Sequence, residues 1–353
     1  MIIERRPIPP SVEMKAAEAA PLLTVNRLKA YYKMNFFDID REVRAVDDVS
    51  LKINRNEIYG LAGESSSGKS SLIKTIAGAI RPPLKVIDGS VRFNFKDGER
   101  DIYKLSPQEL SAIRWSHLSY IMQGSMSVLN PVRRIKYAFV DFALPHVNVK
   151  GADFTNLVER HLKRVHLDPA VLQAYPHELS GGMRQRVTIA LATVCGPEFI
   201  IADEPTTALD VIVQKGVLLM LREIQQELKS SVLFVTHDMA VHANLTDRLG
   251  IMYAGRLVEE GRTRDLFKGP LHPYTAHLIS SLPRIGDEAP KKGLEGSPPS
   301  LADPPPGCRF HPRCPLAIDI CRREAPPMVE ILPGHWAACH VAQADPNRIE
   351  TVV

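Results

Sequence analysis

The residues with the clearest chemistry form a glycine-rich loop from Gly63 to Ser70. The loop reads Gly-Glu-Ser-Ser-Ser-Gly-Lys-Ser, the spacing GxxxxGK(S/T), and lies between an apolar run and a helical pattern. Backbone N–H groups of such a loop surround phosphate oxygens, and the dipole of the following helix favours their charge. Lys69 would reach the β- and γ-phosphates, and the Ser70 hydroxyl would coordinate Mg²⁺. The loop therefore predicts a nucleoside triphosphate site.

Acidic and polar residues follow other apolar runs. Asp203 and Glu204 follow the run 199–202, and His237 follows 232–235. Asp203 suits the Mg²⁺ shell, and Glu204 suits a base that polarises the attacking water. His237 could hydrogen-bond the γ-phosphate, and Gln123 could join Mg²⁺ to a helical segment. Taken singly, each also fits an ordinary solvated strand end.

A second helix start lies in the segment Leu179–Gln185. Ser180 is placed as an N-cap, and Gly181 and Gly182 expose backbone N–H groups. One nucleotide does not need two phosphate-binding helix starts about 110 residues apart. The hypothesis is that this start closes, head to tail, on a nucleotide held by another subunit.

The elements that position these residues follow from the apolar runs. Runs of four or five residues without polar alternation, at 58–62, 199–202 and 232–235, suit strands buried on both faces. Helical patterns such as Ser70–Ala79 and Val211–Leu228 alternate with them, which predicts a doubly wound α/β fold with ligands beyond the carboxyl ends of the strands. Ser106 begins a capping box, and Asp153–Leu167 reads as an amphipathic helix. We therefore expect a helical subdomain at about 106–180.

Composition bounds the class of protein. The 353 residues carry 44 Lys+Arg and 40 Asp+Glu, and the net charge of +4 is too small for a nucleic-acid binder. No window holds the roughly 18 apolar residues that a membrane-spanning helix needs, and the charged N-terminus lacks a signal-peptide core. We expect a flexible tail at 1–21, an ATPase domain at 22–282 and a Pro-rich region at 283–353, in a cytoplasmic chain.

Four of the five cysteines lie in this last region: Cys308, Cys314, Cys321 and Cys339. In a cytoplasmic protein such a group favours a metal over disulfides. The spacing alone does not choose between zinc and an iron–sulfur cluster. The histidines that could replace a cysteine ligand are His311, His335 and His340. A metal held by the four cysteines would stabilise a C-terminal region that is too small to build its own core. The fifth cysteine, Cys195, lies in an apolar helical segment and is better interpreted as a core residue.

Taken together and in order, these motifs resemble an ABC-type ATPase subunit, that is, a P-loop NTPase core with a helical subdomain and here a small Cys-rich C-terminal module. Finer motifs narrow the resemblance to the ATP-binding subunits of dipeptide/oligopeptide ABC importers, over about Leu22 to Val341. These motifs are Tyr175–Arg186, Ala202–Val211, Met252–Arg256, His272–Thr275 and Gly307–Pro315.

The resemblance implies ATP hydrolysis and assigns roles by position. Tyr32, with Tyr31 as the alternative, would stack on adenine. Glu204 would be the catalytic base and His237 the γ-phosphate switch, and a permease helix would dock near Gln123. The remaining assignments form a longer set: phosphates at Gly63, Glu64, Ser65, Ser66, Ser67, Gly68, Lys69, Ser70 and Ser71; Mg²⁺ at Ser70, Gln123 and Asp203; the opposite subunit's ATP at Ser180, Gly181, Gly182 and Gln185; the dimer interface at Asp210; and a 4Fe–4S cluster, with zinc as the alternative, at the four cysteines.

The resemblance also implies partners. These are a second ABC ATPase subunit, in a heterodimer rather than a homodimer, two membrane permease subunits and an extracytoplasmic substrate-binding protein, with the chain peripheral at the cytoplasmic face of the cell membrane. The cargo stays open among peptides, oligosaccharides and nickel.

Two other function classes were weighed. A soluble ABC ATPase of repair or translation would carry long coiled coils or two ATPase halves, and neither is seen. A module that contacts nucleic acid or a regulator would need a basic surface near the cysteines. The basic residues there are Arg309, Arg313, Arg322 and Arg323, and Asp319, Glu324 and Glu330 dilute them.

The sequence departs from the family pattern at two places. Ser66 occupies a loop position where the family usually has glycine, so a position that tolerates positive φ carries a side chain. Gly124-Ser125 follows Gln123 where the family usually has Asp-Pro. The first departure bears on the loop geometry and the second on the fit to a permease.

Overall fold

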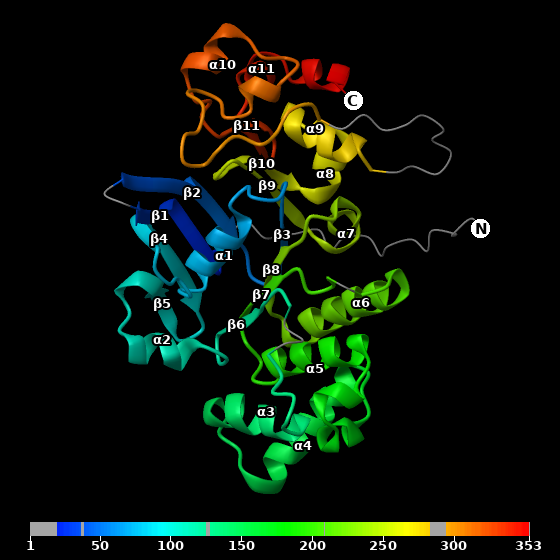
Figure 1. Cartoon of the computed structure of the whole chain (residues 1–353). Coiled ribbons are helices and arrows are strands. Elements are labelled where there is room, and N and C mark those ends of the chain that lie inside the picture. The colour runs from blue at the N-terminus through cyan, green and yellow to red at the C-terminus, as the bar shows by residue number, and fades with distance from the viewer. Residues whose placement is uncertain (1–19, 37–38, 125–127, 208, 283–293, 353) are drawn as a thin grey trace, which may run out of the picture.

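The computed structural model describes residues 20–36, 39–124, 128–207, 209–282 and 294–352. Its central layer is a sheet with the strand order β11-β12-β10-β9-β3-β8-β7-β6, in which β9, β3, β8, β7 and β6 pair in parallel (Figure 1). The three apolar runs of the sequence form β3, β7 and β8, so the predicted parallel sheet is confirmed. The strands are β3 Ile58–Ala62, β6 Leu118–Ile121, β7 Phe199–Asp203, β8 Ser231–Val235, β9 Arg248–Tyr253, β10 Arg256–Arg262, β11 Val329–Leu332 and β12 His335–Ala337.

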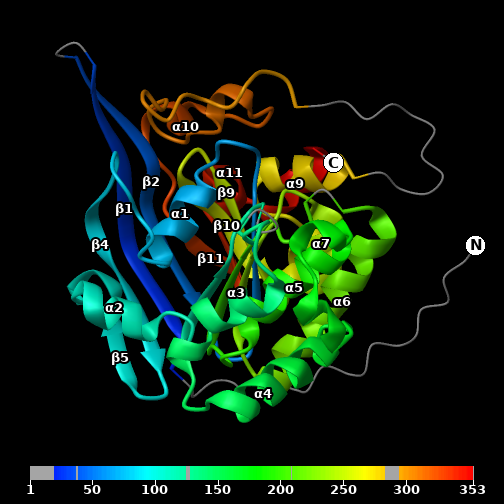
Figure 2. The ribbon, with the colours of Figure 1, turned by 60° about the horizontal axis from the view of Figure 1, so that its bottom comes forward.

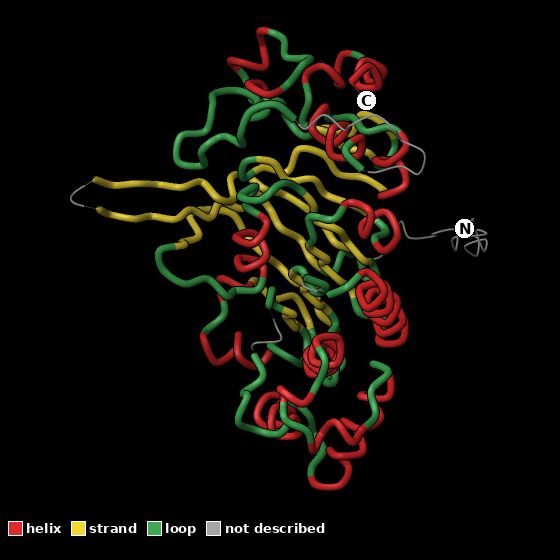
Figure 3. Tube along the Cα trace, turned by 45° about the vertical axis from the view of Figure 1, so that its right-hand side comes forward, coloured by secondary structure: helices red, strands yellow, loops and turns green. Residues whose placement is uncertain are grey.

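A second, antiparallel sheet has the order β2-β1-β4-β5 and was not anticipated from the sequence. Its strands are β1 Leu23–Phe36, β2 Ile39–Ile53, β4 Leu84–Phe95 and β5 Gly98–Asp101. Figure 3 shows β1 and β2 running out together as a long hairpin. Phe93 of β4 contacts Phe199 of β7 edge to face, with ring centroids 5.1 Å apart. The two sheets and helix α1, Lys69–Ile76, thus share one apolar core.

The helical part is smaller than predicted. Helix α2, Pro107–Ile113, begins with the expected capping box at Ser106, but its Leu110 packs on the core of the antiparallel sheet. Strand β6 belongs to the central sheet because it pairs in parallel with β7. The segment 106–180 is therefore not one helical insertion. The helices α3 Ile135–Phe142, α4 Gly151–Arg164 and α5 Gly181–Thr193 lie in the lower part of Figure 1 and share an apolar cluster with the central sheet.

Helices cover the central sheet on the side turned toward the viewer's right in Figure 2. The helix α6 reproduces the predicted range Val211–Leu228. Cys195 is half-buried against the apolar cluster that this helix shares with α5, as expected for a core cysteine. The remaining helices of this part are α7 Met239–Leu245, α8 Thr263–Lys268 and α9 Pro273–Ser280. The short 3₁₀ turns are η1 Ile102–Lys104, η3 Leu144–His146, η4 Pro169–Gln173, η5 Pro176–Glu178, η6 His311–Arg313 and η7 Pro346–Val352.

The C-terminal region extends the ATPase sheet rather than forming a unit of its own. Strand β12 pairs with β10, and Nε2 of His335 lies 2.7 Å from Oε1 of the fully buried Glu259. Its helices are α10 Asp319–Arg323 and α11 His340–Ala344. The predicted tail at 1–21 lies almost wholly outside the described residues, as does the predicted boundary at 283. Among the described helices, none has both the length and the apolar character needed to cross a bilayer.

Candidate ATP site

The phosphate loop turns from β3 into α1 through two glycines that no other residue could replace. Gly63 has φ +146° and Gly68 has φ +103°. A Cβ atom on Gly63 would lie 2.2 Å from the carbonyl oxygen of Met252, and one on Gly68 would lie 2.1 Å from that of Ala45. Positive φ and backbone walls together require glycine at both positions. Ser66 has φ +64°, so it does occupy the left-handed conformation where the family usually has glycine.

Lys69 is folded back onto the loop. Its ammonium donates to the carbonyl oxygens of Gly63 and Glu64 at 2.6 and 2.8 Å and lies 3.2 Å from Oγ of Ser67. Burial lowers the pKa of this ammonium, and the carboxylates of Glu204, Asp203 and Glu64 oppose that shift. The loop thus holds a positive charge where phosphates would bind.

Glu64 is held by two other parts of the chain. Its backbone N–H donates to the Tyr274 hydroxyl at 2.7 Å. Its carboxylate accepts two hydrogen bonds from the guanidinium of Arg313, at 2.9 and 3.3 Å. Sequence reasoning quoted the motifs that contain Tyr274 and Arg313 but gave neither residue a role at the loop.

Asp203 ends β7, and Glu204 follows it directly. The carboxylate of Asp203 is buried and accepts a hydrogen bond of 3.1 Å from the Tyr120 hydroxyl. Burial raises the pKa of this carboxyl, and the hydrogen bond from Tyr120 and the charges of Lys74 and Lys69 oppose that shift. Ser70 is exposed in the first turn of α1, and Gln123 is exposed just after β6. The carboxyl ends of β3, β6 and β7 thus carry the three residues predicted for Mg²⁺.

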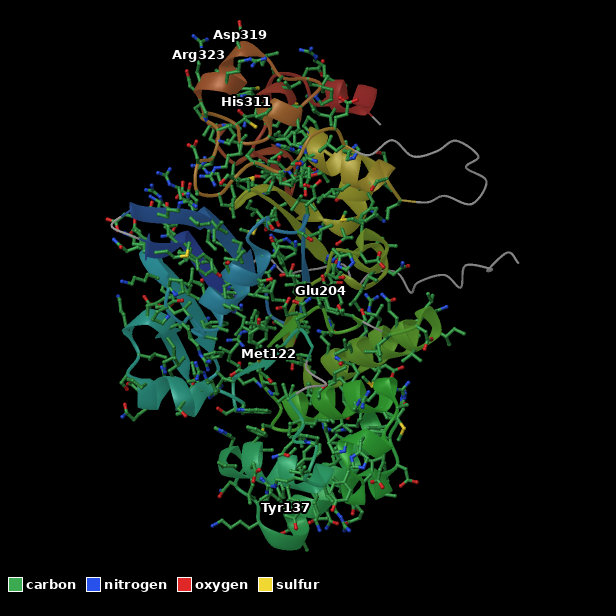
Figure 4. The ribbon with its side chains drawn as sticks, in the orientation of Figure 1. Met122, Tyr137, Glu204, His311, Asp319 and Arg323 are labelled. Atoms are coloured by element: carbon green, nitrogen blue, oxygen red, sulfur yellow. The ribbon has the colours of Figure 1, made fainter. Side chains whose placement is uncertain are left out.

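Glu204 and His237 meet directly. Nδ1 of His237 lies 2.8 Å from Oε1 of Glu204, and the His237 backbone N–H donates to the same oxygen at 3.0 Å. Glu204 has φ +48° and its side chain is 13% exposed, whereas that of His237 is 73% exposed. Figure 4 shows Glu204 in the middle of the molecule. The carboxylate is held by the Thr236 hydroxyl and by His237, which directly follow β8, while the imidazole keeps most of its surface exposed to solvent.

The two candidate adenine-stacking tyrosines on β1 differ. Tyr31 is 8% exposed and its hydroxyl donates to Asp47, so its ring belongs to the core. Tyr32 is half-buried, and its hydroxyl lies 3.1 Å from Oγ of Ser71 on α1. Tyr32 is therefore the tyrosine on the phosphate side of the strand.

The second helix start is intact and open. Ser180 caps α5 with Oγ accepting from the Met183 N–H at 3.3 Å. A Cβ on Gly181 would meet no atom within 4 Å, whereas one on Gly182 would lie 2.7 Å from Val213. Gln185, in the second turn of α5, is buried. Asp210 caps α6 by accepting the N–H groups of Ile212 and Val213, and beside it Val211 and Ile212 are 81% and 85% exposed.

The four C-terminal cysteines share one corner of the molecule. Cys321 and Cys339 are buried, and Cys308 and Cys314 are half-buried. Burial raises the pKa of the Cys308 thiol to about 11 and that of Cys314 to about 12, and the other cysteines of the group raise both further. Nearby backbone N–H groups, at Phe310 for Cys308, at Leu316 for Cys314 and at Ala342 for Cys339, act in the opposite direction and lower the pKa of these thiols.

The structure does not support the metal site that the sequence predicted at the four cysteines. Within the described residues, no group of three or more His, Cys, Asp or Glu side chains is arranged to hold a metal ion. The proposed substitute histidines are occupied elsewhere: Nδ1 of His311 bonds the Cys308 carbonyl, Nε2 of His340 bonds the Glu324 carbonyl, and His335 pairs with Glu259.

The four arginines near the cysteines do not form a shared basic surface, because two of them are buried. Arg309 and Arg313 have side chains only 6% and 7% exposed, and both are paired with acids of the ATPase core, Asp47 and Glu64. Arg322 and Arg323 alone are exposed. Two of the four arginines therefore tie the cysteine segment to the core.

Comparison with known proteins defines the class first. The ABC transporter family matches residues 46–207, and the oligopeptide/dipeptide transporter C-terminal region matches residues 258–321. The dimeric ATP-binding cassette MJ0796 bound to ADP and Pi has the same fold, with a TM-score of 0.59 and 25% identity over 69% of this chain and 99% of its own. The protein is an ABC-type ATPase.

The relatives then define the family. The Dipeptide transport ATP-binding protein DppD of Caldanaerobacter subterraneus subsp. tengcongensis is 38% identical over 91% of this chain and 97% of its own length. The Oligopeptide transport ATP-binding protein OppD of Escherichia coli is 39% identical over 93% and 96%, and AppD of Bacillus subtilis is 38% identical over 92% and 98%. The chain belongs to the ATP-binding proteins of dipeptide and oligopeptide transporters.

Proposed function

We propose that this chain is the ATP-hydrolysing subunit that powers an ABC importer of di- or oligopeptides. The observation that carries the proposal is the pairing of an ABC site, Lys69 with Asp203 and Glu204, with a C-terminal region of the oligopeptide/dipeptide type. Relatives with both parts are named for dipeptide or oligopeptide transport. An oligosaccharide or nickel importer with the same ATPase is the alternative.

In the proposed reaction ATP and water give ADP and phosphate. The loop from Gly63 to Ser71 and Lys69 hold the phosphates, Tyr32 stacks on adenine, and Ser70, Gln123 and Asp203 hold Mg²⁺, which neutralises the developing phosphate charge. Glu204 accepts a proton from the attacking water. His237 leaves Glu204 to donate a hydrogen bond to the γ-phosphate, and its exposed ring in contact with Glu204 supports that movement.

A second ABC ATPase subunit completes the site in this proposal. Ser180, Gly181, Gly182 and Gln185 would contact the ATP held by that subunit, and Asp210 would lie across the interface. The open start of α5 and the exposed Val211 and Ile212 support an interface there, because large apolar side chains are seldom left so exposed on a monomer. A heterodimer remains our preferred pairing.

Two permease subunits and an extracytoplasmic substrate-binding protein are the remaining partners, which places the chain at the cytoplasmic face of the membrane. A groove lined by Val128, Leu129, Tyr137 and Phe142 lies in the helical part, and Met122, next to Gln123, is 50% exposed (Figure 4). Arg133, Arg134 and Asp141 also line the groove, so its mixed apolar and charged lining is suited to an amphipathic permease helix.

The proposal for the cysteines is a 4Fe–4S cluster held by Cys308, Cys314, Cys321 and Cys339, with zinc as the alternative. The four thiols lie close enough to act on one another's pKa, and this proximity supports a shared thiolate site. Anaerobic purification followed by iron, sulfide and zinc analysis tests it, and a protein with neither metal contradicts it. Proteolysis before and after chelation tests the stabilising role.

The transport proposal is tested by ATP hydrolysis of the chain reconstituted in lipid with its membrane partners. The substrate-binding protein is added loaded with a short peptide, then with an oligosaccharide, then with nickel. Stimulation by the peptide-loaded form alone is expected. Stimulation by sugar or nickel alone keeps the ATPase and overturns the peptide cargo, and hydrolysis indifferent to every loaded form contradicts the transport role.

A further inference from the structure

The segment between Cys308 and Cys314 is docked against the phosphate loop. Phe310 is 1% exposed and packs on Tyr253 at the end of β9 and on Tyr274 of α9, with ring centroids 5.2 and 5.5 Å away. Tyr274 in turn accepts the backbone N–H of Glu64. One buried aromatic cluster therefore supports both the cysteine segment and the loop.

Arg313 makes the direct connection. Its side chain is 7% exposed, its guanidinium donates to both carboxylate oxygens of Glu64, and it also lies 3.3 Å from the Tyr253 hydroxyl. Such a fork-on-carboxylate arrangement is directional, so it holds the carboxylate in place as well as neutralising it. The third nitrogen, Nε, donates to the carbonyl of Glu295, which leaves the guanidinium little freedom to move.

Glu64 passes this constraint to the lysine of the loop. The carbonyl oxygen of Glu64 accepts the ammonium of Lys69 at 2.8 Å, and the Glu64 carboxylate acts on that ammonium through its charge. An unpaired carboxylate at this place would repel the phosphates of a nucleotide, because both carry negative charge. Neutralisation by a cation from outside the loop removes that repulsion.

We propose that Arg313 is a positioning residue of the ATP site, which anchors and neutralises Glu64 so that the cysteine-bearing segment becomes part of the nucleotide-binding machinery. The proposal uses the ATPase class of the protein and does not depend on which metal, if any, the cysteines hold. It explains why an acid is tolerated in the second position of a loop that binds anions.

The test is a rescue experiment on the full chain, with a fluorescent ATP analogue and Mg²⁺. Arg313→Gln leaves Glu64 unpaired and should weaken binding about tenfold, a usual scale for the loss of a bidentate charged pair. Adding Glu64→Gln should recover most of that affinity, because the repulsive carboxylate is gone. Arg313→Lys should fall between wild type and Arg313→Gln.

The matched control is Arg323→Gln, which removes an exposed arginine two residues after Cys321 at the outer end of the C-terminal region (Figure 4). It should bind the analogue like the wild type. A double variant that binds no better than Arg313→Gln, or an Arg313→Gln protein with unchanged affinity, overturns the proposal. If Arg313→Gln does not fold, Arg313→Lys with and without Glu64→Gln gives the same comparison.

Discussion

The two helix starts that could hold phosphate differ in how much of their surroundings this chain supplies. At Gly63–Ser71 the chain surrounds the loop with Lys69, the carbonyls of Ala45 and Met252, and the pair of Arg313 with Glu64. At Gly181 a side chain would meet nothing within 4 Å. The first start is built from contacts within one subunit, and the second is presented to the outside. Similar motif chemistry is therefore enclosed by contacts of the chain itself at the first start and left open at the second, where the proposed second subunit would bind.

Gly68→Ala and Gly181→Ala separate the two starts most strongly. An alanine at Gly68 would put Cβ 2.1 Å from the Ala45 carbonyl oxygen at φ +103°, so we expect nucleotide binding to fall by at least about a hundredfold, as for other severe backbone strain. Gly181→Ala should leave binding by the isolated chain within about twofold, because its site is open and its helical φ suits alanine. Titration with a fluorescent ATP analogue measures both, and equal losses would contradict the comparison.

Glu204→Gln tests whether the first site carries the chemistry. The amide keeps the shape of the side chain but cannot accept a proton, so hydrolysis should fall by about 10²–10⁴-fold while ATP binding persists. Phosphate release and nucleotide affinity are measured on the same reconstituted complex. Near-normal hydrolysis would remove Glu204 from the role of base. His237→Ala is the companion variant, because the ring contacts Glu204 at 2.8 Å from an exposed position.

Acid should loosen the part that carries the second start. Burial lowers the pKa of His161 on α4 from the usual 6.5 to about 4, and its Nε2 lies 2.7 Å from Oγ1 of Thr193 on α5. The folded-state pKa is below the unfolded one, so the unfolded chain binds more protons as the pH falls. The stabilisation from neutral His161 is complete above about pH 6.5 and is lost progressively toward pH 4.

His161→Gln keeps a donor toward Thr193 but cannot take up a proton. It should flatten the fall in unfolding free energy between pH 6.5 and 4, by up to about 3 kcal/mol at the acid end. His166→Asn, at an exposed position near the end of the same helix, is the control and should leave the slope unchanged. Urea unfolding at a series of pH values measures both, and matching slopes in the two variants would contradict the assignment.

The sequence predicts the strands that are buried on both faces. It does not predict the strands that are buried on one face only. Runs such as Ile58–Ala62 are apolar along their whole length, and they became the central strands. Strands β1 and β4 alternate apolar and polar residues over a long stretch and carry polar segments such as Asn26-Arg27, where their register shifts. The short β6 was absorbed into an expected helical region because four residues carry little period, and only its partner β7 identifies it.

The sequence predicts those parts of the site whose backbone geometry is set by a few consecutive residues. Gly63, Gly68, Lys69 and Ser180 lie where the spacing put them, since loop and cap chemistry are local. The contacts of Arg309 and Arg313 are not local: they reach acids about 250 residues earlier in the chain, and a row of arginines beside cysteines reads equally well as a basic surface. The burial of both arginines against Asp47 and Glu64, together with the packing of Phe310 on Tyr253 and Tyr274, decides between those interpretations.

Ser66→Gly gives the smallest expected effect and sharpens what the phosphate loop tolerates. Ser66 is exposed at φ +64°, a conformation that costs an L-residue roughly 1–2 kcal/mol and costs glycine nothing. Glycine also gives the unfolded chain more conformational freedom, which lowers the free energy of unfolding by about 0.4–1 kcal/mol and offsets part of the stabilisation. We expect the unfolding free energy to rise by up to about 1 kcal/mol. Ser65→Gly, at an exposed neighbour without positive φ, should lower it by about 0.5–1 kcal/mol, because only the unfolded-state term remains. Opposite signs from adjacent serines in urea unfolding would locate the strain at Ser66 itself, and equal signs would show that the loop relaxes around it.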